Sequence, residues 1–347
     1  MIKSDPSVVF PHFTAHSQAG APYYDEVVSA WVFSRYADVM SVFRCPNLVL
    51  SGLKNKPSNT ASDRSKSHST RVATQRALSR VQLRVWRERF EPEVQALANR
   101  LPDGQPVDLL ASFAQPLCLT LASMVTDVSL DEASRLRVLA EPLRASAAEP
   151  YDPALKKQAA AASTILHSCF HSGPEPLRDS AFVALTHTLP CLLGNVWLAL
   201  LQNRQQWNVL HRSPGLLRIG LQELLRYAEL PRILFRRAAA DLEVSGVRMQ
   251  KGDLVVLNIM AANRDPDRFV DAEHVNVQRR HVRPLTLGAG PNSCVGANLI
   301  RLATITMTHP LIERFPNAAL DRSVEFKGGS GFRFPASLWV TFTASSA

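Results

Sequence analysis

The stretch LGAGPNSCVGANLIR, residues 287–301, gives the strongest structural signal in this sequence. Its glycines, Gly288, Gly290 and Gly296, allow the backbone to turn tightly and to approach another group closely. Cys294 lies between these glycines and before a predicted helix, where backbone N–H groups and the positive helix end stabilise a thiolate. Such a thiolate suits a single bond to a soft metal. The alternative is a buried, inert cysteine beside a structural turn.

The composition around this stretch is that of a globular protein. The chain has 347 residues, of which 46% are hydrophobic and 20% are charged, so it can bury a large core. The net charge of +9 permits a nucleic-acid partner without indicating one, and it suits an acidic protein partner equally well. The five cysteines include no CxxC pair, so we expect neither a disulfide framework nor a zinc site.

Hydropathy favours a soluble protein with no membrane association. The N-terminal residues lack the apolar core of a signal peptide. The longest apolar stretch, residues 189–201, is interrupted by Pro190, Gly194 and Asn195 and is too short for a membrane span. No change of composition marks a linker, so we expect one cytoplasmic domain over residues 1–347.

The periodicity of apolar residues predicts a mainly helical fold with a small β portion. Apolar positions recur at helical spacing through the middle of the chain, and short runs bounded by turn residues indicate strands. A polar segment over residues 51–70, rich in Ser, Lys, Asn and Thr, predicts a long loop. The expected helices cover 36–44, 71–220 with short breaks, about 215–227, and 297–315. The expected strands cover 27–28, 30–33, 242–247, 253–257 and 332–343.

Residues 287–301 resemble the cysteine-ligand loop of the cytochrome P-450 family, written FGxGxHxCxGxxLAR. The three glycines, the cysteine, Leu299 and Arg301 match this pattern, and Asn292 stands where the family has His or Arg. Other segments resemble the family in the same order along the chain. They are FSRYADV at 33–39, ELLR at 223–226, RRAAADLE at 236–243, KGD at 251–253 and AANRDP at 261–266.

The resemblance implies a triangular, mostly helical prism with small β-sheets. It also implies heme b with Cys294 as the axial thiolate, whose electron donation favours O–O cleavage. Electrons from NAD(P)H would arrive through an acidic, ferredoxin-type partner. We therefore predict a monomeric heme-thiolate monooxygenase of bacterial secondary metabolism, which oxidises a small-molecule or carrier-tethered substrate.

The resemblance also implies roles for charged residues. Glu223 and Arg226 lie one helical turn apart and are expected to pair, and Arg279 lies where the family places the arginine that completes their cluster. Arg236 would point at a heme propionate. Arg71 and Arg76 lie near the register of the family's other propionate partners, although an exposed helix face explains them equally well. The Gly-rich loop and the neutral donor Asn292 would complete the cofactor contacts.

The segment that aligns with the family's oxygen-activating helix departs from the family pattern. Residues 184–188 align with (A/G)GxxT, in which an acid usually precedes the threonine. Thr188 keeps the alcohol, His187 replaces the acid and Leu185 replaces a glycine. Three interpretations stay open: His187 relays protons, since histidine titrates near neutrality; it is a satisfied histidine while water or substrate delivers protons; or oxygen activation is altered.

A second departure is a short region between Leu143 and Ala184, where the family's F, G and H helices roof the substrate pocket. Only residues 154–171 have the pattern of a full helix there. A shortened roof predicts an open pocket, a large or carrier-tethered substrate, or a degraded family member. From the family layout, the pocket is expected to include Phe182, Ala184, Leu185, Ile233, Leu234 and Gly331.

Two other functions compete with the monooxygenase. A heme-thiolate isomerase, dehydratase or peroxygenase would need no electron supply, and the missing acid at position 187 motivates this alternative. A non-catalytic heme-binding or carrier-binding remnant would keep only the scaffold. No sequence motif supports nucleic-acid binding.

Overall fold

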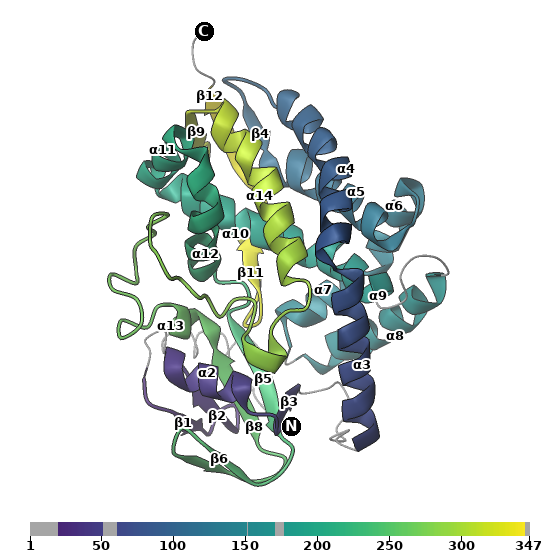
Figure 1. Ribbon diagram of the computed structural model, residues 1–347, viewed down its shortest axis with the longest axis vertical. Helices are drawn as coiled ribbons and strands as arrows, with labels where there is room; N and C mark the ends of the chain where they lie inside the picture. The colour runs from purple at the N-terminus through teal and green to yellow at the C-terminus, as the bar shows by residue number, and fades with distance from the viewer. Residues whose placement is uncertain (1–19, 51–60, 151, 171–176, 344–347) are drawn as a thin grey trace.

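Helices form the body of the molecule, with small sheets at its two ends and the strand β11 near its middle (Figure 1). The computed structural model describes residues 20–50, 61–150, 152–170 and 177–343. The predicted mainly α class is confirmed. The α-helices are α2 (Tyr36–Arg44), α3 (Ala61–Ala77), α4 (Arg80–Asn99), α5 (Gln115–Thr126), α6 (Leu130–Leu139), α7 (Glu141–Ala148), α8 (Pro153–Cys169), α9 (Arg178–Val183), α10 (Leu189–Gln202), α11 (Arg204–Arg212), α12 (Leu217–Tyr227), α13 (Ile259–Asn263) and α14 (Ala297–Arg314).

Shorter helical segments connect some of these elements. Two are π-helical, η1 (Leu110–Ala114) and η3 (Ala184–Thr188), and two are 3₁₀ turns, η4 (Pro214–Leu216) and η5 (Gly290–Asn292). The segment η3 joins α9 to α10, so that a single helical run extends over Arg178–Gln202. A π-helical turn inside a long helix is rare and often marks a functional site.

The strands form four small sheets. The largest has the order β1-β2-β8-β5-β3, with β2 and β8 parallel and the other pairs antiparallel, and it lies at the lower end in Figure 1. The sheet β4-β12-β9 closes the opposite end. The strands are β1 (Tyr23–Asp25), β2 (Ala30–Phe33), β3 (Leu48–Leu50), β4 (Pro106–Asp108), β5 (Ile233–Ala238), β6 (Leu242–Val244), β7 (Val247–Met249), β8 (Leu254–Asn258), β9 (Asn317–Leu320), β10 (Phe326–Gly328), β11 (Arg333–Pro335) and β12 (Trp339–Thr343).

Helix α10 lies at the centre of the core. It is buried from Leu189 to Leu201, and apolar residues surround it on all sides, which is the pattern of a core helix. Trp197 donates from Nε1 to Thr308 Oγ1 of α14 at 3.0 Å, so its one polar atom is satisfied. In the described part of the chain, the run Arg178–Gln202 is long and apolar enough to cross a membrane, but 83% of its most apolar window is buried inside the protein.

Three predictions of local structure were wrong. Residues 61–70 begin α3 rather than continuing a loop, because the polar sequence contains no Gly or Pro to interrupt a helix. The expected strand 242–247 is two strands, since Ser245 and Gly246 have φ of 52° and 76° and form a tight hairpin turn. The expected strand at 27–28 lies in a turn. Residues 51–60 of the predicted loop lie outside the described residues.

The short roof predicted from the sequence agrees with the helices present. Between α7 and α9 the described chain contains one helix, α8, which packs along α7. The described part of residues 143–184 therefore holds the end of α7, α8 and α9. Helix α7 meets α6 at Ala140, just before this region, and packs against η3.

Candidate functional site

Cys294 lies on a tight turn before α14. Gly288 and Gly290 have φ of 67° and 58°, in the left-handed region that favours glycine. The Cys294 N–H donates to the Leu287 carbonyl at 2.6 Å, and the Cys294 carbonyl accepts from the Ala297 N–H at 3.2 Å. These bonds hold the cysteine backbone in one conformation at the start of the helix.

A cavity of about 410 Å³ opens beside Cys294. Its walls are the cysteine loop, the first turns of α14 and the end of α3. From α3, Arg71 donates through Nη2 to the Ser293 carbonyl at 2.8 Å and to Ser293 Oγ at 3.0 Å. The fold therefore brings Arg71 to the cysteine loop. Arg76 is exposed and does not line this cavity. The backbone of Asn292 belongs to η5, and its side chain lies outside the described part.

Burial is the main influence on the thiol of Cys294, and it raises the pKa of this group. The Gly296 N–H and the charges of Arg71 and Arg301 act in the opposite direction and lower the pKa. A cation bound to the sulfur would add to this second effect, since metal binding removes the proton from a thiol. The loop is thus suited to a thiolate ligand whose charge is shared with a metal.

Arg236 is a buried cation with no anion beside it in the described chain. It lies on β5 with 3% of its surface exposed, and its Cζ stands 5.5 Å from the centre of the Phe43 ring. Its Nη1 donates to the Phe235 carbonyl at 2.7 Å, whereas its buried Nε has no hydrogen-bond partner among the residues that the structure describes. Burial lowers the pKa of Arg236 to about 10. Such a group needs a negative partner to satisfy it.

Phe43 connects Arg236 to the cysteine loop. The Phe43 carbonyl oxygen lies 3.6 Å from where a Cβ on Gly290 would be, and its ring faces the guanidinium of Arg236. The unsatisfied cation is therefore near the loop that holds Cys294. A cysteine, a loop-bound arginine and an unsatisfied buried arginine fit an anionic metal cofactor, whose carboxylates would accept charge-assisted hydrogen bonds.

The structure brings Glu223, Arg226 and Arg279 together as a fully formed cluster. Arg226 donates from Nε and Nη2 to the two carboxylate oxygens of Glu223, each at 2.8 Å, and both side chains are completely buried. Arg279 Nε lies 3.1 Å from Glu223 Oε1. The remaining donors of Arg226 reach backbone carbonyls at Asn263, Ala272 and His274. The cluster therefore joins α12 to the segment that leads to the cysteine loop.

Residues 184–188, which align with the family's oxygen-activating segment, form the π-helical turn η3. Ala184 is exposed in the middle of the long helix, and Thr188 is half-buried. Leu185, Thr186 and His187 are buried, and Thr186 donates from Oγ1 to the Phe182 carbonyl at 2.8 Å. The π-helical turn therefore contains both residues that depart from the family pattern, Leu185 and His187.

His187 faces the corner between α6 and α7. Only 4% of its side chain is exposed, its Nε2 lies 3.0 Å from the Arg137 carbonyl, and its Nδ1 lies 3.5 Å from Glu141 Oε2. Burial lowers the pKa of His187, and Glu141 opposes this effect. Because both ring nitrogens face this corner, the geometry favours a satisfied histidine. The proton-relay role stays a prediction. Sequence reasoning missed Glu141, because it lies in a separate helix and belongs to no motif.

The six residues expected in the pocket lie in different surroundings. The Phe182 ring is buried with its centre 5.4 Å from that of Phe170, and Leu185 and Ile233 are also buried in apolar clusters. Leu234 is half-buried on β5. The Gly331 N–H donates to the Ala148 carbonyl at the end of α7 at 3.0 Å. Ala184 is exposed. Their common role in a pocket stays a prediction.

Comparison with known proteins gives a consistent family signal. The family model described as Cytochrome P-450 matches residues 205–324 of this chain. The nocardicin C N-oxygenase of Nocardia uniformis subsp. tsuyamanensis is 29% identical over 288 residues, which cover 73% of this chain and 72% of that protein. The linalool 8-monooxygenase of Pseudomonas putida is 28% identical over 256 residues, which cover 65% of this chain and 63% of that protein.

A solved structure shares the fold over almost the whole chain. P-450BioI, in complex with an acyl carrier protein that bears hexadec-9Z-enoic acid, matches with a TM-score of 0.83. Its sequence identity is 19%, and the match covers 97% of this chain and 98% of that one. The overall arrangement of elements is therefore conserved between the two structures even where their sequences have diverged.

Proposed function

Because the chain belongs to the cytochrome P-450 family of heme-thiolate monooxygenases, we propose that Cys294 is the axial ligand of heme b in an oxygen-inserting enzyme. One observation supports this most directly. The loop that holds Cys294 is bonded to one arginine and lies near a second, Arg236, which is buried with no anion beside it among the described residues.

The residues of this chain would bind and orient the heme, which supplies the oxidising chemistry when bound. Arg71 and Arg236 would neutralise its carboxylates, and the backbone at Gly288, Gly290 and Gly296 would approach it closely. Arg76 would contact a heme carboxylate only from its exposed position on α3. In η3, Ala184 offers a small exposed surface, and Thr188 Oγ1 would hold a proton that the reaction consumes.

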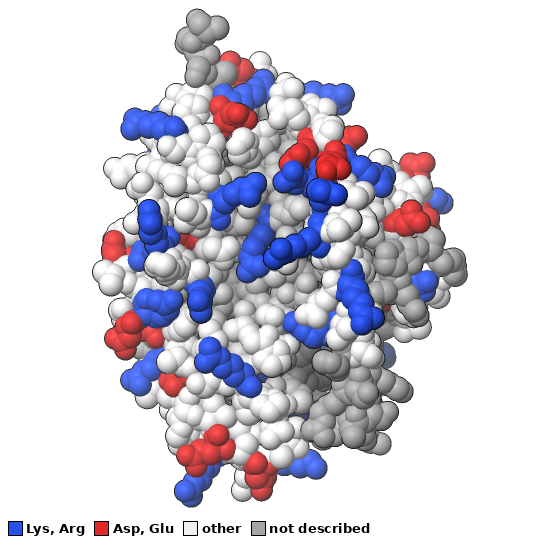
Figure 2. Space-filling view, in the orientation of Figure 1, with Lys and Arg blue, Asp and Glu red and all other residues white. Residues whose placement is uncertain are grey.

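An acidic, ferredoxin-type electron donor would dock on the face that carries α4, α12 and α14. Lys and Arg side chains gather across the middle of this face (Figure 2). Arg71 and Arg301 line the cavity beside Cys294, and Arg87 and Arg218 line a second hollow. A concentration of positive charge steers an acidic partner towards the surface where electrons must enter.

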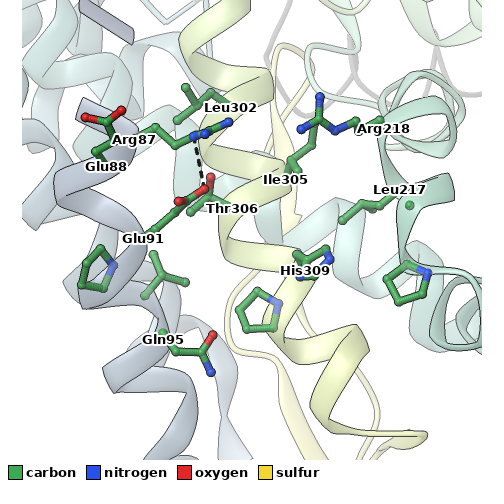
Figure 3. A pocket seen from close by; sticks show the side chains of 15 residues that line it. Arg87, Glu88, Glu91, Gln95, Leu217, Arg218, Leu302, Ile305, Thr306 and His309 are labelled. Carbon is green, nitrogen blue, oxygen red and sulfur yellow. Dashed lines mark ion pairs between the residues drawn. The ribbon is translucent and has the colours of Figure 1, made fainter. Parts of the chain in front are cut away.

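The second hollow has a volume of about 800 Å³, and α14 forms its floor. Figure 3 shows Arg87 of α4 and Arg218 of α12 on opposite walls, with Ile305 and Thr306 between them. Arg87 Nε lies 3.3 Å from Glu91 Oε1, so its charge is already paired. Arg218 is exposed and has no ion pair in the described chain, so it is the freer of the two to contact an acidic partner.

The substrate would be a small molecule of bacterial secondary metabolism, either free or tethered to a carrier protein. The short roof, in which α8 alone lies between α7 and α9 in the described chain, supports a substrate that enters from a large partner. One relative is named for action on nocardicin C, and one structural neighbour holds a carrier-bound fatty acid. Spin-state titration with the same acyl chain, free and on a carrier protein, would separate the two forms of substrate.

A second candidate function is a peroxygenase, isomerase or dehydratase that needs no electron donor. It is favoured by the absence of an acid at position 187, where His187 is directed to the α6–α7 corner. Turnover with peroxide, or with substrate alone and no reductant, would support this candidate. Turnover that requires NAD(P)H and a ferredoxin would exclude it.

The experiment that tests the monooxygenase proposal is the absorption spectrum of the reduced protein with carbon monoxide. We expect the Soret band typical of thiolate ligation in the wild-type protein and its loss in Cys294→Ser. Cys169→Ser, at another half-buried free cysteine, should keep the band. Purified protein that takes up no heme, or a Cys294→Ser spectrum identical to the wild type, would overturn the proposal.

A further inference from the structure

A carboxylate faces position 187 from a different helix. Glu141, in the first turn of the roof helix α7, places Oε2 3.5 Å from His187 Nδ1. His187 immediately precedes Thr188 in η3. Resting on the proposed function, we propose that Glu141 and His187 form a pH-sensitive positioning pair, which links the Thr188 turn to the roof of the protein.

Hydrogen bonding determines which nitrogen of His187 can titrate. The Arg137 carbonyl, 3.0 Å from Nε2, can only accept a hydrogen bond, so Nε2 carries a proton. The second proton must therefore bind and leave at Nδ1. Nδ1 faces Glu141, so a proton that binds there interacts directly with the carboxylate.

The same residue fixes η3 to its neighbours through its backbone. Cys191 of α10 donates from Sγ to the His187 carbonyl at 3.1 Å. The His187 side chain reaches the last turn of α6 and the first turn of α7. His187 therefore connects η3 to α6, α7 and α10. A change of charge on its ring would act on the conformation of the adjacent Thr188.

The charges around the pair define two states. Four residues face His187 or its partner: Glu141 and Arg144 on α7, Arg137 on α6 and Cys191 on α10. Burial raises the pKa of Glu141, but its hydrogen bond to Arg144 and the nearby positive charges outweigh this and lower it. Glu141 thus stays ionised in mild acid. A neutral His187 presents a lone pair to this carboxylate, whereas a protonated His187 donates a hydrogen bond to it and draws η3 towards α7.

Histidine-selective NMR of the reduced, carbon monoxide-bound holoprotein tests the pair directly. His187→Gln would identify the His187 signals. We expect Nδ1 to be the titrating nitrogen, and we expect Glu141→Gln to lower the pKa of His187 because it removes an attractive charge. Glu313→Gln is the matched control, since Glu313 lies 3.4 Å from the exposed His309 and should not affect His187. Titration at Nε2, or an unchanged pKa in Glu141→Gln, would refute the pair.

Hydrogen exchange of the peptide that contains residues 184–191 tests positioning. After correction for intrinsic exchange, we expect its protection in the wild type to fall several-fold as His187 protonates, because burial disfavours the charged ring, and to fall further in Glu141→Gln, where no carboxylate offsets that charge. If that variant fails to fold, Glu141→Asp, which keeps the charge with a shorter reach, should give an intermediate profile. Equal profiles in variant and wild type would overturn the proposal. Because the carbon monoxide spectrum tests the iron site separately, a normal thiolate band with no change in exchange would refute this pair alone.

Discussion

The segment that contains Cys294 and the segment that contains η3 differ in how closely they follow the family. Residues 205–324 match the family model, and there the fold brings together the Glu223 cluster and the cysteine loop. The region from α6 to η3 lies outside this match, and its buried Leu185 and His187 stand where the resemblance predicts a glycine and an acid. We expect the matched segment, which holds the buried ion-pair cluster, to tolerate substitution least.

The largest loss of stability is expected from Glu223→Gln, within the segment that matches the family model. Glu223 and Arg226 have no exposed surface, and the change leaves Arg226 and the nearby Arg279 without a countercharge. Removing one partner of a buried ion pair costs about 3–5 kcal/mol. We expect the free energy of unfolding in urea to fall by this amount, or the protein to be insoluble.

An exposed pair provides the control for this prediction. Arg248 Nε lies 3.2 Å from Glu243 Oε2, but the two side chains are 91% and 56% exposed. Glu243→Gln should cost less than about 1 kcal/mol, because water screens such pairs. Similar losses in the two variants would contradict the view that burial makes the Glu223 cluster essential.

The second effect concerns the fit of Arg236 to an anionic cofactor. Arg236→Met removes a buried cation whose Nε has no hydrogen-bond partner in the described part of the chain, so the heme-free protein should keep its stability. Heme should leave about ten- to a hundredfold faster, since a hydrogen bond to a charged group contributes about 1.5–3 kcal/mol. The measurement is the rate of heme transfer to apomyoglobin. Arg237→Met is the control, because the neighbouring side chain points to the other face of β5 and donates to the Gly252 carbonyl. Equal rates would remove Arg236 from the cofactor site.

Much of the structure of residues 205–324 could be predicted from the sequence, because its motifs consist of residues that are close together along the chain. The turn at Cys294 requires glycine at positive φ, and Glu223 and Arg226 are neighbours on one helix face. The secondary structure of residues 61–70 was harder to predict, because their polar composition suggests a loop while the absence of Gly and Pro permits a helix. The contact of Glu141 with His187 could not be predicted at all. It depends on how α7 packs against η3, which no spacing within either segment reveals.

The third prediction concerns η3, outside the segment that matches the family model, and the pH dependence of stability. Burial lowers the pKa of His187, so the unfolded chain binds a proton at higher pH than the folded chain does. The contribution of neutral His187 is complete above the unfolded value of about 6.5 and is lost as the pH falls below it. One group can change stability by at most about 1.4 kcal/mol per pH unit.

His187→Gln removes this titration and can still donate to the Arg137 carbonyl, so its urea stability should depend less on pH between neutrality and mild acid. Glu141→Gln should have a steeper loss than the wild type, since it removes the charge that offsets burial. An identical pH dependence in all three proteins would mean that His187 is not held as a buried neutral group.

The smallest effect is expected for a single exposed charge in residues 205–324, which contributes to the association rate with the electron donor. Arg218→Glu reverses an exposed charge on the wall of the hollow beside α14. Two unit charges at 4 Å interact by about 1 kcal/mol in water, so the association rate with an acidic ferredoxin should fall about fivefold at low salt. Arg248→Glu, on the distant β6–β7 hairpin, should leave the rate unchanged. In about 1 M salt the Debye length shrinks to about 3 Å, so the two variants should become equal. A deficit of Arg218→Glu that persists in high salt would indicate altered packing of α12 rather than lost attraction.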